Sequence, residues 1–392
     1  MIGRKISVVG IGGAGARIVG QMPSDADDGP ITFAVDTDTC SLVESSATER
    51  IQIGEVVTAG FGTGGDTQQG REAAEHDTAK ILAMLENMEL VVVVAGLGGG
   101  VGGGATPVVL GAAQEAGAAT VCFVTLPFDF EGAQRKAAAA KDMEALREIC
   151  DTVVVVRNNS LFESVDSRDI AGVFKEADSL LSSGVYSLYQ MLALPGYLRL
   201  DLADLRRLSS DTKGECLFAA AGAEGEDRAS KAVESLLTGS LMEQGKLAER
   251  ARLLMLSIVG GPDLTLKEIG QIMDGISSTV RPQCRVVMGT SVDDGWIGRI
   301  SLMAIVGEKR KVRPQVETEI PQQPVSEHPA EGPPLSPIAA QPSKKRKRRP
   351  RQERLKLEAS GRGRFKDVEP TILDGEDMDV PTFIRRGMRI EK

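Results

Sequence analysis

Short runs of apolar residues, most of them β-branched, alternate with helical patterns along the first part of the chain. The runs are ISVVG from Ile6, ITFAVD from Ile31, VVVV from Val91, ATVCFVTL from Ala119 and TVVVV from Thr152. Apolar runs without regular polar positions are typical of strands buried on both faces, as in a parallel sheet. Helical patterns such as REAAEHDTAKILAMLENM and VVLGAAQEAG lie between them. We therefore expect an α/β domain built on a parallel, Rossmann-like sheet.

A longer helical pattern runs from about Ile170 to Leu194 and would span roughly 37 Å, enough to connect two distant sites. Residues 214–308 then alternate strand and helix patterns, as in a compact α+β layer. Beyond them, residues 312–343 are rich in Pro, Gln, Glu and Ser and predict a disordered segment. The expected parts are a first domain 1–169, a central helix 170–195, a smaller α+β domain 196–308, a disordered linker 309–376 and a C-terminal peptide 377–392.

Composition is that of a soluble globular protein of 392 residues, long enough for two or three domains. No apolar run reaches the ~18 residues that span a bilayer, and the N-terminus lacks the apolar region of a signal peptide, so we expect a cytoplasmic protein. Five scattered cysteines without a CxxC pair, and only two histidines, argue against a zinc site or a disulfide framework.

Charge is divided unevenly along the chain. Residues 309–392 carry 20 basic and 13 acidic residues, whereas residues 1–308 carry a net charge of −16. The block Lys344–Lys356 holds nine basic residues and one acid. It is either a solvated, self-repelling stretch of linker or a contact for an anionic membrane or nucleic acid. The acidic body is a poor candidate for direct nucleic-acid binding.

Three glycine-rich loops are the strongest chemical signal. They are IGGAG after the first strand, AGFGTGGDTQQG at 59–70, and GGGVGGG at 98–104, which directly follows the valine run. Pro107 suits the first turn of a helix, so we expect a helix from there. A strand, a glycine loop and a helix N-terminus together form an anion site, and we expect a nucleotide phosphate in it.

Two classes of nucleotide protein remain open on these loops. Gly10, Gly12 and Gly15 fit the dinucleotide fingerprint, and Asp36 ends the next apolar run, where it could hold a ribose. A Rossmann oxidoreductase is therefore one hypothesis. Such a fold needs a single glycine loop, however, and several loops that close around one polyphosphate account for all three better.

Two groups of charged residues could carry chemistry. Glu131 and Arg135 lie one helical turn apart, and their simpler interpretation is a surface ion pair. Asp201 and Asp204 are three residues apart after Pro195, where capping or solvation is as good an explanation as catalysis.

Taken in order, these segments resemble FtsZ, the bacterial tubulin-like cell-division GTPase. The resemblance covers about 1–308 and the last dozen or so residues. Its segments are ISVVGIGGAGARIVGQM, AGLGGGVGGGATPVV, PFDFEGAQR, GVFKEADSLL, PGYLRLDLADLR, GEDRA, GTSVDD and VPTFIRR. It implies a GTPase domain, a central helix, a GTPase-activating C-terminal domain, and GTP-dependent head-to-tail filaments that form the division ring.

The resemblance also assigns roles to particular residues. It implies phosphate binding by Gly12, Gly13, Ala14, Gly15, Ala16 and Arg17, and by Gly98, Gly99, Gly100, Val101, Gly102, Gly103 and Gly104. It implies ribose and phosphate contacts for Glu131 and Arg135, stacking of Phe174 on guanine, and acceptance of guanine hydrogen bonds by Asp178. Asp201 and Asp204 would act on the nucleotide of the next subunit. The ligands would be GTP or GDP with Mg²⁺ bound to the nucleotide, and we expect no separate metal site.

The resemblance gives the tail a role as well. Asp379–Arg386, with the sequence DVPTFIRR, resembles the peptide by which the family docks on membrane-tethering division proteins. Apolar anchors followed by charges are typical of a recognition peptide at the end of a disordered tether. We therefore expect a membrane-associated ring at the division site.

Departures from the family pattern affect the expected chemistry. The signature loop usually carries threonines where this chain has Val101 and Gly103, and family asparagines are replaced by Arg17 and Arg199. If the alignment holds, both arginines add positive charge where polyphosphate would lie. Such charges could strengthen binding without helping turnover. We expect GTP hydrolysis to be retained at a reduced rate; the alternative is a divergent filament scaffold with weak or absent turnover.

Overall fold

The computed structural model describes residues 5–23, 29–160, 170–193, 198, 203–205 and 215–308, together with 372–373 and 376–377. The chain divides into two compact units, 1–316 and 317–392. The first unit contains both predicted domains and the central helix. In the second unit, β11 (Ile372–Leu373) pairs antiparallel with β12 (Glu376–Asp377). The other residues of the predicted linker and of the C-terminal peptide lie outside the described residues.

One ten-stranded sheet organises the first unit, in the order β3-β2-β1-β4-β5-β6-β7-β10-β8-β9. The first six strands are parallel: β1 (Ile6–Ile11), β2 (Ile31–Asp36), β3 (Glu49–Gln52), β4 (Leu90–Gly96), β5 (Ala119–Leu126) and β6 (Thr152–Arg157). All except β3 correspond to the predicted apolar runs. The other strands are β7 (Glu215–Glu224), β8 (Ala251–Gly260), β9 (Arg285–Val292) and β10 (Arg299–Glu308). Here β10 runs antiparallel to β7 and β8, and β9 runs parallel to β8.

The two predicted layers share this sheet instead of forming separate ones. Strand β7 pairs with β6 in parallel over three residues, Val153 to Val155 on the β6 side. Beside this junction, the rings of Phe123 and Phe218 meet edge to face at 6.0 Å between centroids. The chain therefore carries its hydrogen-bonded ladder from the first half directly into the second.

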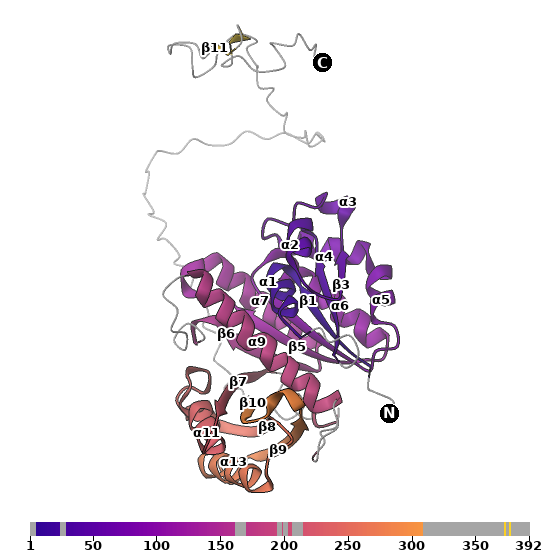
Figure 1. Ribbon diagram of the computed structural model, residues 1–392. Helices are drawn as coiled ribbons and strands as arrows, with labels where there is room; N and C mark the ends of the chain where they lie inside the picture. Colours follow the sequence, from indigo (N-terminus) through magenta and orange to yellow (C-terminus); the bar gives the residue numbers. More distant parts are fainter. Residues whose placement is uncertain are drawn as a thin grey trace, which may run out of the picture. The chain divides into compact units, whose positions relative to one another are not determined.

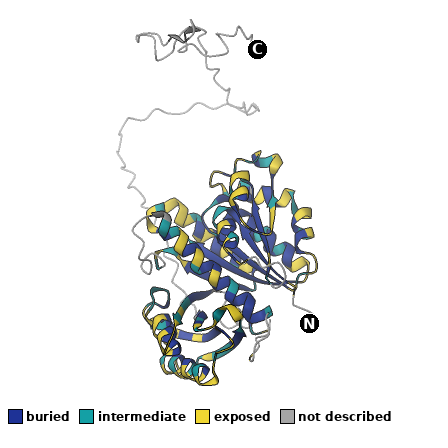
Figure 2. Cartoon of the chain, in the orientation of Figure 1, coloured by how far each residue is buried: buried dark blue, intermediate teal, exposed yellow. Residues whose placement is uncertain are grey.

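The central strands are buried on both faces, as their continuous apolar sequences predict. Alternate residues of β4 enter two different cores, with Val91 and Val93 on one face and Val92 and Val94 on the other. All four valines are at most 1% exposed. Figure 2 shows the strands as a buried layer, with exposed positions on the outward sides of the helices.

Helices cover both faces of the sheet. They are α1 (Gly12–Gly20), α2 (Thr39–Glu44), α3 (Glu55–Thr58), α4 (Thr67–His76), α5 (Thr78–Leu85), α6 (Gly100–Glu115), α7 (Ala133–Ile149), α9 (Ile170–Ala193), α11 (Arg228–Thr238), α12 (Lys246–Arg250) and α13 (Leu266–Thr279). Apolar residues of α5, α6, α7, α11 and α13 belong to one core, and those of α1 and α9 belong to the other. Figure 1 shows the resulting three-layer arrangement in the first half of the chain.

Helix α6 begins at Gly100, seven residues before the Pro107 start that the sequence predicts. Glycine is a poor helix former, so the pattern favours a loop here. The tertiary contact with α4 explains the difference. A Cβ added at Gly104 would lie 2.1 Å from the carbonyl oxygen of Thr67. Only a bare backbone fits that closely against α4, and the glycine loop therefore continues into the helix with Pro107 inside it.

The helical pattern predicted from Arg71 forms two helices, α4 and α5, instead of one. The break falls at Asp77, whose carboxylate accepts a hydrogen bond from Gly54 N–H at 2.7 Å and pairs with Lys80 at 3.2 Å. Helix α4 also starts inside the predicted 59–70 loop. Asp66 caps it by accepting from the amides of the second and third helical residues.

The long central helix is confirmed as α9, 24 residues that span roughly 36 Å. Its apolar face, which includes Leu181, Val185 and Leu188, packs on the sheet. Near its C-terminal end, Gln190 Nε2 donates to Asp293 Oδ2 at 2.8 Å. Helix α9 thus contacts α1 near its start and reaches β8 and β9 near its end (Figure 1).

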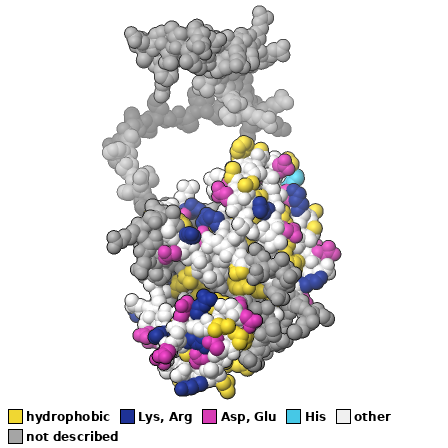
Figure 3. Space-filling view, viewed as in Figure 1, with side chains coloured by type: hydrophobic (Ala, Val, Ile, Leu, Met, Phe, Trp, Pro, Cys, Tyr) yellow, Lys and Arg dark blue, Asp and Glu magenta, His cyan; other side chains and the backbone are white. Residues whose placement is uncertain are grey.

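The surface carries charges of both signs. Lys and Arg intermix with Asp and Glu on the face seen in Figure 3. Among the residues that the structure describes, the most exposed large apolar side chain is Phe61, which is 89% exposed and lies in the 59–70 glycine loop. Among the described helices, none combines the length and the apolar character needed to cross a bilayer.

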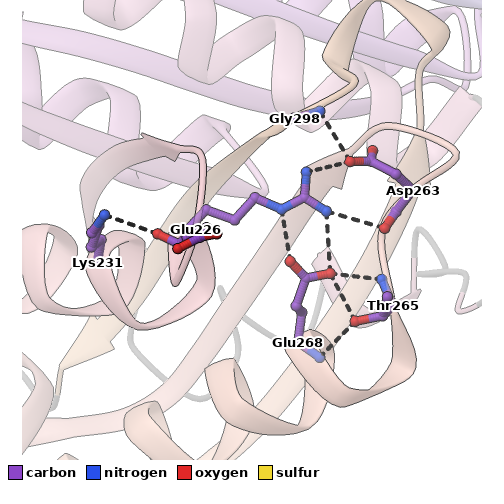
Figure 4. Close-up of polar contacts among 7 residues, drawn as sticks. Glu226, Lys231, Asp263, Thr265, Glu268 and Gly298 are labelled. Carbon is purple, nitrogen blue, oxygen red and sulfur yellow. Dashed lines mark hydrogen bonds and ion pairs between the residues drawn. The ribbon is translucent and has the colours of Figure 1, made fainter.

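Arg228, at the start of α11, is the centre of a buried ionic network. Figure 4 labels its partners Asp263 and Glu268. Its side chain is 6% exposed, and it donates to Asp263 Oδ2 and Glu268 Oε1, each at 2.7 Å. Asp263 also accepts from Gly298 N–H, and Glu268 forms a capping box with Thr265 at the start of α13. The network therefore joins α11, α13 and the loops before α13 and β10.

We predict that Arg228→Ala lowers the free energy of unfolding by about 3 kcal/mol, because it leaves a partly buried carboxylate pair without its cation. Chemical denaturation of the full chain measures the change. Lys231→Ala is the matched control, since Lys231 lies on the same helix and its bond to the Glu226 carbonyl is exposed. That control should change stability by less than about 0.5 kcal/mol. Similar losses in both variants would contradict the network's role.

Because of Glu268, we expect the folded protein to lose stability as the solution becomes acidic. Hydrogen bonds from the Arg228 guanidinium lower the pKa of Glu268 from 4.5 to about 2. A lowered folded-state pKa contributes stability that is present above the ordinary pKa and is lost as the pH falls through the folded value. Between about pH 5 and pH 2, the wild type should therefore lose more unfolding free energy than Glu268→Gln. If the unfolding free energies of the two proteins fall equally with pH, the Glu268 carboxylate is not the cause of the loss in acid.

Candidate functional site

A cavity of about 540 Å³ opens at the carboxyl ends of the parallel strands. The sheet order reverses direction between β1 and β4, because β2 follows on one side of β1 and β4 and β5 follow on the other. In open α/β sheets, ligands bind at such a switch point. The cavity is lined from the ends of β1, β2, β4 and β5 and from helix α9.

All three glycine-rich loops meet at this cavity. Its walls include Gly12 and Gly13 from the first loop, 61–64 from the second and 99–102 from the third. The first and third loops are in close contact. Gly12 has φ +71°, and a Cβ there would lie 3.1 Å from the amide nitrogen of Gly102. Because α1 and α6 both begin in these loops, two helix N-termini face the same space, an arrangement that favours an anionic ligand.

Aromatic and acidic side chains of α9 line the cavity as well. Phe174 and Asp178 are one helical turn apart, and both line it. Phe174 packs edge to face against Phe128, at 5.3 Å between centroids. A planar ring with a carboxylate one turn away can stack a flat heterocycle and accept hydrogen bonds from its edge.

Asp178 is paired with Arg17. Arg17 Nε donates to Asp178 Oδ2 at 3.0 Å, while Asp178 Oδ1 has no hydrogen-bond partner among the described residues. Burial raises the pKa of the Asp178 carboxyl, and the Arg17 charge opposes that rise. The site therefore presents a buried carboxylate with one acceptor oxygen still available, beside a half-exposed guanidinium.

Glu131 and Arg135 form an ion pair at the edge of the cavity, at 2.9 Å. Glu131 also accepts from Phe128 N–H at 2.7 Å, which fixes the turn that follows β5. The Arg135 side chain is half exposed, so its remaining donors are open to an anion in the cavity.

Comparison with known proteins identifies this arrangement. A model of the tubulin/FtsZ family GTPase domain matches residues 5–166, and a model of the FtsZ family C-terminal domain matches residues 214–309. Cell division protein FtsZ 1 of Archaeoglobus fulgidus is 37% identical over 288 residues, which cover 74% of this chain and 77% of that protein. This chain belongs to the FtsZ family.

Further FtsZ relatives agree with this assignment. Cell division protein FtsZ of Haloferax mediterranei is 35% identical over 301 residues, 77% of this chain and 79% of that protein. An empty FtsZ dimer from M. jannaschii superimposes with a TM-score of 0.71 at 32% identity, covering 78% of this chain and 88% of that one. The predicted family and fold are thereby confirmed, and the chain carries the family's GTPase domain.

Most of the predicted binding residues of this FtsZ-family chain lie around the cavity. The lining includes Gly12, Gly13, Ala14, Arg17, Gly99, Gly100, Val101, Gly102, Glu131, Arg135, Phe174 and Asp178. The other five are not among its lining residues: Gly15, Ala16, Gly98, Gly103 and Gly104. Gly15, for example, packs against the backbone of β4, where a Cβ would lie 2.3 Å from the Val94 carbonyl oxygen.

Arg17, which is expected to add positive charge where polyphosphate would lie, lines the cavity and is also paired there with a carboxylate. Its guanidinium is directed to Asp178 on α9, because that buried carboxylate is within hydrogen-bond reach. Its charge is thus partly neutralised on the α9 side of the cavity. Arg199, the other substituted asparagine position, lies outside the described residues.

The carboxylate of Asp36 is hydrogen-bonded within the turn that follows β2. Its Oδ1 accepts from Thr37 N–H at 2.7 Å, and the side chain is 3% exposed. Burial raises the pKa of this carboxyl, and hydrogen bonds from Ser41 and the turn amides oppose the rise. With the FtsZ family established, the oxidoreductase hypothesis and its ribose role for Asp36 are set aside.

Sequence reasoning missed several lining residues, among them Ser41, Thr125 and Asn158. Thr125 lies near the carboxyl end of β5, and Asn158 directly follows β6. A polar residue at the carboxyl end of a strand is the signal that could have found both. Ser41 is in helix α2, after β2, where no sequence pattern indicates a ligand.

Of the predicted catalytic pair, the structure describes Asp204. Asp201 lies outside the described residues. Asp204 is described, away from the cavity walls, with its Oδ1 3.9 Å from Arg285 Nη2 on β9. Within the described part of the chain, no cluster of three acidic, histidine or cysteine side chains could hold a metal ion.

Arg17→Ala should lower the unfolding free energy by about 1 kcal/mol at pH 7, because it removes the cation from a buried carboxylate while Arg17 itself is half exposed. The loss should shrink as the pH falls and Asp178 takes up a proton. Denaturant titrations at several pH values measure it. Arg71→Ala is the control, because both members of the Arg71–Glu75 pair are more than half exposed. Equal losses in the two variants would show that Asp178 does not depend on Arg17.

Proposed function

We propose that this FtsZ-family protein binds GTP in the cavity, polymerises head to tail and hydrolyses GTP at the contact between successive subunits of the division ring. The observation that carries the proposal is the convergence of three glycine loops and α9 on one cavity. Two helix N-termini suit a polyphosphate, and Phe174 with Asp178 suits a base that donates hydrogen bonds.

The base would be guanine. Its N1–H and 2-amino groups are donors, and Asp178 offers an acceptor oxygen that Arg17 leaves open. Adenine presents an acceptor at N1 instead, which a carboxylate repels. Arg17 keeps this acceptor charged despite its burial, since its positive charge opposes the raised pKa. Glu131 and Arg135, at the cavity edge, would contact ribose and phosphate.

Hydrolysis would need groups from a second subunit. The cavity walls supply backbone amides and the guanidinium groups of Arg17 and Arg135, which suit phosphate. The wall carboxylates Asp36, Glu131 and Asp178 are each already hydrogen-bonded or paired within the chain, so they are not free to orient a water. Asp204 lies away from the cavity of its own chain. We therefore propose that Asp201 and Asp204 act in trans, which would make polymerisation the switch for turnover.

Mg²⁺ would bind together with the nucleotide. Mg²⁺ commonly keeps several waters and takes its remaining ligands from substrate phosphates and one or two carboxylates. The cavity fits this mode, because its walls combine the loop amides that would hold phosphate with the carboxylate of Asp36. The ion would screen the phosphate charges; the protein's own part is to hold the phosphates with loop amides.

The C-terminal segments of the chain would determine where in the cell the filament lies. We propose that Asp379–Arg386 binds membrane-tethering division proteins, and that Lys344–Lys356 contacts an anionic membrane or nucleic acid. The protein would then act in the cytoplasm, as a ring held at the membrane. The support is the sequence resemblance and the charge of these segments, both of which lie outside the described residues.

GTP hydrolysis measured against protein concentration, with pelleting in GTP and in GDP, tests the proposal. Specific activity should rise steeply above a threshold, pellets should need GTP, and ATP should support neither. Asp204→Asn should lower turnover by roughly 100-fold, whereas Asp274→Ala, an exposed acid on α13, should leave it unchanged. Filaments that form without concentration-dependent hydrolysis would favour the alternative of a scaffold with little turnover.

Mixing two defective variants tests action in trans. Asp204→Asn retains the cavity, and Asp178→Ala retains the Asp204 segment. At mixed contacts, the intact Asp204 of one subunit would meet nucleotide in the intact cavity of the other. The mixture should therefore hydrolyse GTP faster than the sum of the two variants alone. Activity equal to that sum would show that the acid acts within its own chain.

A further inference from the structure

The space beside Gly103, where the family's signature loop carries a threonine, is already filled in this protein. The carboxylate of Asp142, from α7, lies against the glycine. A Cβ built at Gly103 would be 2.2 Å from Asp142 Oδ2 and 2.5 Å from Asp142 Cγ. No side chain at position 103 can coexist with this carboxylate unless one of them moves. The glycine and the aspartate are therefore complementary.

The same carboxylate holds the start of the signature loop. Gly98 N–H donates to Asp142 Oδ2 at 3.0 Å, in a buried hydrogen bond. Gly98 has φ +79°, and a Cβ there would lie 2.4 Å from the carbonyl oxygen of Arg135. Arg135, Ala139 and Asp142 are spaced by four and three residues, so one face of α7 lies directly on the loop.

Burial makes this hydrogen bond important for Asp142. The residue is 5% exposed, and burial raises the pKa of its carboxyl, which the Gly98 amide and the charge of Lys141 oppose. A buried polar group without a partner is costly, so the loop amide and the carboxylate each depend on the other. The four residues that follow Gly98, from Gly99 to Gly102, line the cavity.

We propose that Asp142 is a positioning residue of the nucleotide site, which replaces the missing side chain at position 103 and holds the loop in its binding conformation through Gly98. The inference rests on the proposed GTP site. In this view, α6 lacks the usual side chain at position 103, and the carboxylate of Asp142 on α7 occupies its space. We call this replacement the exchange. Asp142 acts through the loop and does not itself touch the nucleotide.

A double-mutant cycle tests the exchange without any nucleotide. In the wild-type background, Gly103→Ala should lower the melting temperature, because its Cβ meets the carboxylate. In the Asp142→Ala background, the same change should be neutral or stabilising, because alanine is a better helix former than glycine and the space is open. A change of sign between the backgrounds supports the exchange. Equal effects in both backgrounds would overturn it.

Nucleotide affinity tests the positioning role, measured with labelled GDP on dilute protein. Asp142→Ala should weaken binding roughly tenfold, as expected for the loss of a buried hydrogen bond to a charged group. Asp142→Asn retains an acceptor for Gly98 and should stay within about threefold of the wild type. Glu148→Gln, at an exposed position of α7, is the control and should bind as the wild type does.

The outcomes separate the two proposals. A wild type that binds neither GDP nor GTP would contradict the proposed function. A wild type that binds while Asp142→Ala binds equally well would overturn the positioning role alone. Asp142→Asn that binds as weakly as Asp142→Ala would also overturn it, because the hydrogen bond to Gly98 would then not be what matters.

Discussion

Burial of the central parallel strands on both faces is the constraint on which the rest of this structure depends. Strand β4 is enclosed by β1 and β5 at its sides and by helices above and below, and it contains no residue that needs water. Parallel neighbours require crossover connections, and because the strands all run in the same direction their carboxyl ends lie at one edge of the sheet. The loops that bind a ligand are therefore gathered by the same packing that stabilises the core.

At that edge of the sheet, the glycine loops offer backbone groups to a ligand where other proteins would use side chains. Helix α6 lies so close to α4 and α7 that its first residues have little room for a Cβ, which explains the run of glycines better than flexibility does. Close packing leaves the loop amides free to face the cavity. It also means that a change in one helix requires a matching change in its neighbour, as Gly103 and Asp142 illustrate.

Three buried charged groups follow a similar rule. Asp178, Asp142 and Arg228 are all buried, and each has a hydrogen-bonded partner on another element. Because an unpaired buried charge is costly, each of these contacts also fixes how two elements meet. Arg228 joins α11 to α13, Asp142 joins α7 to the signature loop, and Asp178 joins α9 to α1. Electrostatic pairing thus specifies relative positions that apolar packing alone leaves less well defined.

Sequence alone was sufficient for the parallel sheet, the long helix α9, the glycine loops and the family, because each depends on a local pattern or on an ordered set of motifs. The strands of residues 215–308 also follow directly from their apolar runs. It did not reveal that β7 extends the first sheet, that α6 begins at Gly100, or that Arg17 is directed to Asp178. Those features depend on contacts between residues far apart in the chain. Local propensity describes what a segment prefers in isolation, whereas the start of a glycine helix and the direction of an arginine are decided by the neighbour that lies within reach after folding.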